Sequence, residues 1–304
     1  MADMTPFTVY GQDFSTSFDM GTSNLVSSAL SAVSAPFTAL IVLWIIVTGM
    51  LIMRGDIDTR RGITRIVRVC LVSAFIMEAG VYNSYVSSFF QTGLPNWVAD
   101  SVSNGKASST PEAFDQILNT IGHQVATIDS HLSWYQIVDL IELACAQLVS
   151  FVLLVVCFAV YIVAHAMTDV LVVAGPFLIG GFLFDATRHI AERWIGKLIG
   201  LALLTLLVNI AITIVTNGIE NYIKISGLNA MAKSGTPDIA IQVLFETLMY
   251  MGIGAFIICM LPAVSASIGG GVALNAAGPV LNSIVGGASG GVNTIARALN
   301  SRKT

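Results

Sequence analysis

The sequence predicts an all-α integral membrane protein with about five transmembrane helices and one re-entrant or broken half-helix. Of its 304 residues, 55% are hydrophobic and only 11% are charged, whereas soluble domains carry about 25% charged residues. The charges cluster between long uncharged stretches, as expected of a chain that crosses a bilayer several times. The uneven distribution of Lys and Arg adds an orientation, with the N-terminus outside the cytoplasm and the C-terminus inside it.

A polar N-terminal segment, 1–27, precedes the membrane domain, 28–268. Residues 1–24 contain no Lys or Arg and carry three acids. A cleavable signal peptide is therefore not expected, because such a peptide begins with positive charge. Each later uncharged run is long enough for a spanning helix of about 20 residues. We expect the five spans at about 28–53, within 69–99, at 143–168, at 198–219 and at about 239–262.

A short apolar run follows the third expected span. Between Asp169 and Asp185 lie fifteen apolar residues, VLVVAGPFLIGGFLF, too few for a full span of about 20. The Gly175-Pro176 pair is expected to break a helix at this point. Irregular backbone at membrane depth is tolerated only where it packs on protein or faces a water-filled cavity. The run 170–184 therefore predicts a broken or re-entrant half-helix.

The distribution of Lys and Arg selects the topology, because these residues concentrate in cytoplasmic loops. If 170–184 is re-entrant, the loops 54–68 and 185–197 and the tail 269–304 share one side. That side then holds eleven Lys and Arg, against three on the other. If 170–184 spans fully, each side holds seven. The re-entrant solution is favoured, and the Gly- and Ala-rich tail becomes a cytoplasmic extension, flexible or ordered by a partner.

The extracytoplasmic loop 91–136 is predicted to contain a helix. Thr110, Pro111 and Glu112 form a good helix start, with an N-cap, a proline and an acid in the first turn. Apolar residues then recur at helical spacing, and their face must lie on the bilayer surface or on a partner protein. Both alternatives remain open. The face comprises Phe114, Ile117, Leu118, Ile121, Val125 and Ile128, and the expected interfacial anchors beside the loop include Tyr82, Tyr85 and Trp97.

Two carboxylates are expected within the membrane, Glu78 near the middle of the second span and Glu246 about two turns into the fifth. Intramembrane charge is costly and often functional, so a polar pathway or proton relay is one interpretation. A hydrogen-bonded carboxyl inside the bundle, or a contact between subunits, is the other. The second is favoured, since a coupled transporter usually shows more such groups. His165 and Asp169 lie four residues apart at the inner end of the third span, where they can pair with each other without a ligand.

No motif for catalysis, metal binding or nucleotide binding stands out. The four cysteines all fall inside apolar runs and are interpreted as small buried hydrophobes. The run Gly269-Gly270-Gly271 is not followed by the Lys of a phosphate-binding loop. We therefore expect no enzymatic activity, cofactor or metal. The segment Asp185–Lys197 is amphipathic, with Arg188 and Glu192 four residues apart, and predicts an interfacial helix on the cytoplasmic face.

The run GPFLIGGFLFDATRHIAERWIGKLIGLALLTLLVN resembles the core of a known family. That family is the polytopic inner-membrane subunit of bacterial type IV secretion systems, the TrbL-like or VirB-six-type family. Its usual layout, a periplasmic N-terminus, a central periplasmic loop and a cytoplasmic C-terminus, is the layout that the charge distribution favours. The matching features are Gly175, Pro176, Phe184, Thr187, Arg188, Trp194 and the apolar span that follows.

The resemblance implies a non-enzymatic platform or channel subunit in the inner membrane of a Gram-negative cell. Such subunits form homo-oligomers in the lipid bilayer together with other inner-membrane proteins of the secretion machine. They support a periplasmic stalk of minor pilin and help to pass DNA–protein complexes or proteins outward. Separate ATPases supply the energy for this transfer. The alternative is a secondary transporter with a site at the broken helix. Transporters usually carry paired repeats, and no second Gly-Pro half-span occupies a matching position. The stalk contacts expected from the resemblance are Phe14, Phe18, Phe114, Ile117 and Ile121.

Overall fold

The structure, a computed structural model, is built from helices. It describes residues 4–55, 59–103, 107–130, 137–226 and 237–268, and these contain no strand. The tail 269–304 and part of the loops therefore lie outside the described residues. The helices are α1 (Pro6–Met53), α2 (Thr59–Met77), α3 (Ala79–Tyr82), α4 (Leu94–Ser103), α5 (Thr110–Asp129), α6 (Ile137–Ile179), α7 (Arg188–Ser226) and α9 (Pro237–Ile268), with π-helical turns η1 (Asn83–Ser87) and η2 (Phe89–Gly93) and a 3-10 turn η3 (Gly180–Leu183).

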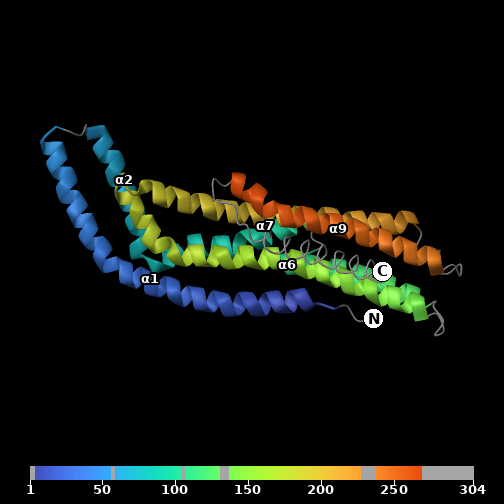
Figure 1. The fold of residues 1–304 in the computed structure, drawn as a ribbon. Helices are drawn as coiled ribbons and strands as arrows, with labels where there is room; N and C mark the ends of the chain where they lie inside the picture. Colours follow the sequence, from blue (N-terminus) through green and yellow to red (C-terminus); the bar gives the residue numbers. More distant parts are fainter. Residues whose placement is uncertain (1–3, 56–58, 104–106, 131–136, 227–236, 269–304) are drawn as a thin grey trace, which may run out of the picture.

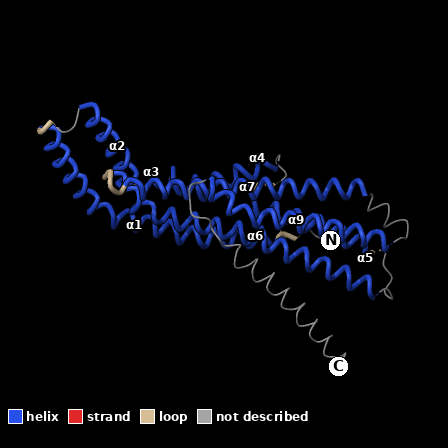
Figure 2. The backbone as a smooth tube through the Cα atoms, turned by 45° about the horizontal axis from the view of Figure 1, so that its top comes forward, coloured by secondary structure: helices blue, strands red, loops and turns tan. Residues whose placement is uncertain are grey.

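The helices form one elongated bundle with an arm. Helices α6, α7 and α9 run side by side with the first half of α1, whereas the second half of α1 and α2 leave the bundle together as the arm (Figure 1). The view in Figure 2 shows the same separation of arm and bundle. Two hydrophobic cores match this division. One joins α5, α6, α7 and α9, and the other joins α1, α2, the end of α6 and the start of α7.

The long helices exceed the thickness of a bilayer. At 1.5 Å per residue, the 48 residues of α1 extend for about 72 Å and the 43 residues of α6 for about 64 Å. The hydrocarbon core is about 30 Å thick, so each helix projects beyond it even at the usual tilts of membrane helices. The polar segment 1–27 is therefore not separate from the first span. From Pro6 onward it is the first half of the same continuous helix.

The predicted fold class is confirmed. Four helices are long and apolar enough to cross a membrane, and a fifth span results if the bent pair Val69–Met77 and Gly80–Val102 counts as one. The predicted position of the helix break, at Gly175-Pro176, was wrong. Helix α6 continues through Gly175 and Pro176 to Ile179. The broken span is the second one, which bends by 95° at Glu78.

Candidate functional site

The motif residues Gly175 and Pro176 form a close junction with α3 and α7. A proline inside a helix leaves the carbonyl four residues earlier without its N–H partner. For Pro176 that carbonyl belongs to Val172, and the hydroxyl of Tyr82 donates to it at 2.6 Å. Tyr82 and Val172 are both fully buried, so the replacement bond is shielded from solvent. This bond explains why α6 continues where the sequence predicted a break.

Trp194 of α7 holds the neighbouring turn of α6. Its indole Nε1 donates to the carbonyl of Leu171 at 2.8 Å, and its side chain is buried. Gly175 lies between the two aromatic residues. A Cβ atom at this position would overlap the hydroxyl of Tyr82 and the ring of Trp194. The glycine is therefore required for the close approach of α3 and α7 to α6.

A short turn joins this junction to α7. The hydroxyl of Thr187 donates to the carbonyl of Gly181 at 2.8 Å, and its backbone N–H donates to Phe184 at 3.1 Å. Arg188 begins α7, and its guanidinium binds Glu192 at 2.6 Å with both side chains about half exposed. The predicted Arg188–Glu192 pair is thus present. It lies on the surface, where such a pair contributes about 0.3–0.5 kcal/mol.

Four of the motif residues form one connected unit in the structure. Gly175, Pro176 and Trp194 meet at the junction, and Thr187 closes the turn beside it, while Arg188 faces away from the core. The sequence did not reveal the role of Tyr82, which was expected at the membrane interface as an anchor. Tyr82 is buried instead, because its hydroxyl serves the carbonyl freed by Pro176. The proline itself was the signal that a donor had to come from elsewhere.

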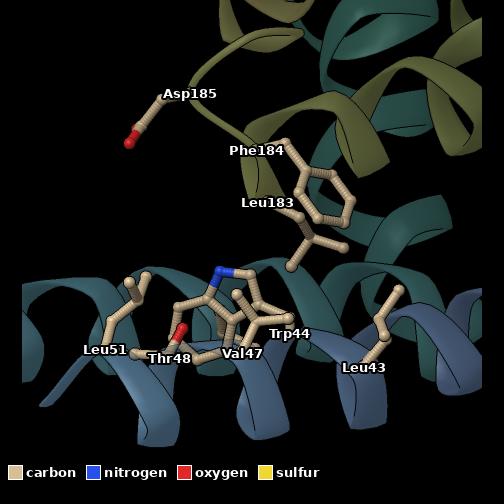
Figure 3. A pocket seen from close by; sticks show the side chains of 9 residues that line it. Leu43, Trp44, Val47, Thr48, Leu51, Leu183, Phe184 and Asp185 are labelled. Carbon is tan, nitrogen blue, oxygen red and sulfur yellow. The ribbon is translucent and has the colours of Figure 1, made fainter. Parts of the chain in front are cut away.

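An apolar groove lies beside the junction (Figure 3). Its volume is about 170 Å³. Figure 3 shows Trp44 of α1 facing Leu183 and Phe184, whereas the carboxylate of Asp185 points away from the groove. Most of the lining side chains are apolar, and Thr48 adds a hydroxyl. Such a groove suits an apolar chain or side chain. The lining residues are Leu43, Trp44, Val47, Thr48, Leu51, Val69, Leu183, Phe184 and Asp185.

The two candidate intramembrane carboxylates both lie on the exterior. Glu78 occupies the break between α2 and α3 and is exposed. Glu246 of α9 is also exposed, and it accepts hydrogen bonds from the hydroxyl of Tyr222 on α7 and from Gln242 at 3.3 Å. Glu246 is thus hydrogen-bonded between two helices, but on the surface of the bundle rather than inside it.

The aromatic residues of α1 and α5 fall into two different environments. Phe14 stacks on Phe18 with ring centroids 5.2 Å apart, and both are partly exposed on α1. By contrast, Phe114, Ile117 and Ile121 are buried in the core. The apolar face of α5 is thus covered by this chain's own helices, neither by the bilayer surface nor by a separate protein. The helical spacing of apolar residues predicted the apolar face of α5, but not which part of the protein packs against it.

The start of α1 is bound to α5. Asp115, itself buried, accepts from the backbone N–H of Phe7 at 2.9 Å and of Thr8 at 2.7 Å. These are two of the N–H groups left free at a helix N-terminus. Asn119 adds a two-way bond with the backbone of Met4, at 2.9 Å in each direction. The first turn of α1 is therefore capped by a helix about one hundred residues away in the sequence.

The pair of His165 and Asp169 on α6 gains an unexpected neighbour. His165 Nε2 lies 3.9 Å from Asp169, as the four-residue spacing predicted, and also 4.0 Å from Asp19 of α1. From the sequence, Asp19 and this pair were expected on opposite sides of the membrane. They meet because the first half of α1 packs along α6 in the bundle.

Comparison with known proteins agrees with the motif. A family model described as TrbL/VirB6 plasmid conjugal transfer protein matches residues 41–263. Protein VirB6 of Rhizobium radiobacter and that of Agrobacterium fabrum are each 35% identical over 266 residues, which is 87% of this chain and 90% of the relative. The type IV secretion system protein VirB6 of Bartonella quintana is 27% identical over 272 residues, covering 88% of this chain and 78% of the relative.

Proposed function

The chain belongs to the TrbL/VirB6 family of plasmid conjugal transfer proteins, and from that premise we propose that it is an inner-membrane platform subunit. It is a component of a type IV secretion system and a multi-pass protein of the Gram-negative inner membrane. The proposal adds that copies of the chain assemble with one another beneath a periplasmic stalk of minor pilin. In this role it supports transfer of DNA–protein or protein substrates while separate ATPases supply the energy.

The length and surface of α1 carry this proposal. The helix extends far beyond a bilayer's thickness, and its first half presents a ladder of aromatic rings, Tyr10 on Phe14 and Phe14 on Phe18. A helix end outside the bilayer with aromatic side chains partly exposed suits contact with another protein, since aromatic residues are enriched at interfaces. Phe14 and Phe18 thus stay candidates for the stalk contact.

Three of the earlier stalk contacts no longer belong to this proposal. Phe114, Ile117 and Ile121 are almost fully buried, so a partner would reach them only by opening the bundle. Their role is to fix α5 in place, and α5 in turn holds the start of α1 through Asp115. The same helix pair therefore supports the surface that we assign to the stalk.

The junction around Gly175 supports the platform role in a different way. Tyr82, Gly175 and Trp194 fasten the base of the arm to the bundle. The arm itself exposes large apolar side chains such as Leu43 and Ile46, which suits lipid or a second subunit. A fixed angle between arm and bundle lets copies of the chain meet in a repeated geometry. The chain is proposed to do this without chemistry of its own.

The test is co-purification from the native host in mild detergent. Wild-type chain should retain the minor pilin and other secretion components, identified by mass spectrometry. A Phe14→Ala, Phe18→Ala double variant should retain the inner-membrane partners and lose most of the minor pilin. Val9→Ala, Met20→Ala is the matched control, because these residues are exposed on the same half of α1. If the double variant retains the pilin as wild type does, the ladder is not the stalk contact.

A wild-type chain that purifies alone would contradict the platform role itself. The transporter alternative gains no support from the structure, since Glu78 and Glu246 are both exposed. A chain without envelope partners that moved a small solute after reconstitution would nevertheless favour it.

A further inference from the structure

We propose that Asp19, His165 and Asp169 form a binding site for one divalent transition-metal ion between α1 and α6. Each residue offers one ligand atom, and the three atoms all lie within 4.8 Å of one another. All three residues lie outside the motif that begins at Gly175.

The helices converge these side chains by simple geometry. Residues four apart project from the same face of a helix, which places His165 and Asp169 together on α6. The first half of α1 packs along that face and adds Asp19, whose carboxylate lies 4.0 Å from His165 Nε2. Two carboxylates and one imidazole from two helices thus surround a common point.

The two α6 residues of the cluster are buried, Asp19 is partly exposed, and polar atoms of the cluster lack hydrogen-bond partners. Asp169 has no exposed surface and His165 is 8% exposed. Asp19 Oδ1 and His165 Nε2 have no hydrogen-bond partner among the described residues, and the polar side chain of η2 that interacts with the Asp169 carboxylate is that of Gln91. A buried polar group without a partner costs about 1–3 kcal/mol, and more when it is charged. A ligand that binds all three side chains at once would remove this cost.

Pairing among the three side chains does not satisfy them. The distances of 3.9 and 4.0 Å from His165 Nε2 exceed the limit of a hydrogen bond, about 3.5 Å. Helices α1 and α6, which supply the three side chains, and the two π-helical turns contain no Lys or Arg. The cluster therefore groups two carboxylates and one imidazole without a cationic side chain from these elements, an arrangement that a bound cation would compensate.

The donor set indicates the class of ion. Imidazole nitrogen with carboxylate oxygen suits Zn²⁺ and its first-row neighbours, whereas Ca²⁺ and Mg²⁺ are bound by oxygen alone. Tetrahedral bonds of about 2.1 Å place ligand atoms about 3.4 Å apart, so each side chain needs to move by less than about 1 Å. Three protein ligands leave one position for water, as in other three-ligand zinc sites.

The surroundings are those of a supported site. The ring of Tyr161 stacks on that of His165 with centroids 6.2 Å apart. Gln91 of η2 donates to the hydroxyl of Thr22, one turn after Asp19, at 3.4 Å. π-Helical turns are rare and occur often at functional sites, and η2 carries Gln91 to the cluster. A bound ion here would fasten the first half of α1 to α6.

The experiment is a metal titration of the full chain in detergent, purified with a tag that lacks histidine. After treatment with a chelator, Zn²⁺ is titrated in competition with a chromophoric chelator, and Co²⁺ is added in parallel to record its visible absorption. We expect one saturable equivalent in the wild type. Asp19→Asn and Asp169→Asn should each weaken binding by about tenfold or more, since ligand support alone contributes about 10–100-fold.

The control is Asp139→Asn, which removes a carboxylate from the distant end of α6. This variant should bind Zn²⁺ and Co²⁺ as the wild type does. Monodisperse elution establishes that each variant is folded. If Asp169→Asn does not fold, Asp19→Asn decides, because its side chain is 29% exposed. Absence of saturable Zn²⁺ and Co²⁺ binding by folded wild type overturns the proposal. Unchanged binding in the two site variants does so as well.

Discussion

The hydroxyl of Tyr82 takes the place of the N–H that Pro176 lacks. The sequence identified Pro176 as a point where α6 loses a hydrogen bond, and the loss is real. It did not identify the replacement donor, since Tyr82 is 90 residues from Val172 in the chain. A local pattern reveals a missing bond but not the distant group that supplies it. The predicted break at 170–184 failed for this reason.

Tyr82→Phe should destabilise the junction with little change in shape. The substitution keeps the ring and removes the donor, which leaves the buried carbonyl of Val172 unsatisfied at a cost of about 1–3 kcal/mol. We expect a lower thermal unfolding midpoint of the purified chain in detergent. Tyr85→Phe is the matched control, because Tyr85 is 71% exposed. This variant should have the same unfolding midpoint as the wild type. Equal unfolding midpoints in both variants would show that the carbonyl of Val172 needs no donor from Tyr82.

Among the helices, α5 was the best predicted and α1 the least. The residues at helical spacing after Thr110 do form one buried face. The helix start was displaced by one residue, since Ser109 is the N-cap and its hydroxyl accepts from Glu112. For α1, composition divided a polar segment from an apolar span. The structure joins them in one helix that also contains Pro36, because a change in polarity along the chain does not by itself interrupt the backbone hydrogen bonds of a helix.

Asp115→Ala should release the first turn of α1. The carboxylate accepts from two backbone N–H groups, and loss of a helix cap costs about 0.5–2 kcal/mol. Amide hydrogen exchange in this turn should become roughly tenfold faster, since about 1.4 kcal/mol corresponds to a factor of ten. Exchange in the rest of α1 should change less.

Asp129→Ala on the same helix is the comparison for this variant. Asp129 is exposed at the C-terminal end of α5, where an acid opposes the helix dipole, so its removal should leave the first turn of α1 protected. Equal exchange in both variants would mean that Asp115 does not hold α1.

In the whole molecule, the C-terminal part of α1 lies close to the turn that follows α6. The groove of Figure 3 is lined both by α1 near Leu51 and by the turn at Asp185. Sequence analysis assigned both connections to the cytoplasm from their Arg and Lys content alone. That assignment stays a prediction. The structure supplies positions at which it can be tested, since the two halves of α1 must emerge on opposite sides of the bilayer.

Cysteine labelling decides the orientation. In a chain whose four native cysteines are replaced, Gln12→Cys and Met53→Cys place single thiols at exposed positions on the two halves of α1. A maleimide that cannot cross membranes should label Gln12→Cys in spheroplasts and Met53→Cys only in inverted vesicles. The expectation rests on the positive-inside rule, because eleven of the fourteen Lys and Arg residues fall on the side of Met53 when Ile137–Leu183 crosses the membrane once. The opposite labelling would place the stalk-facing half of α1 in the cytoplasm, and the proposed contact of Phe14 and Phe18 with a periplasmic pilin would fail with it.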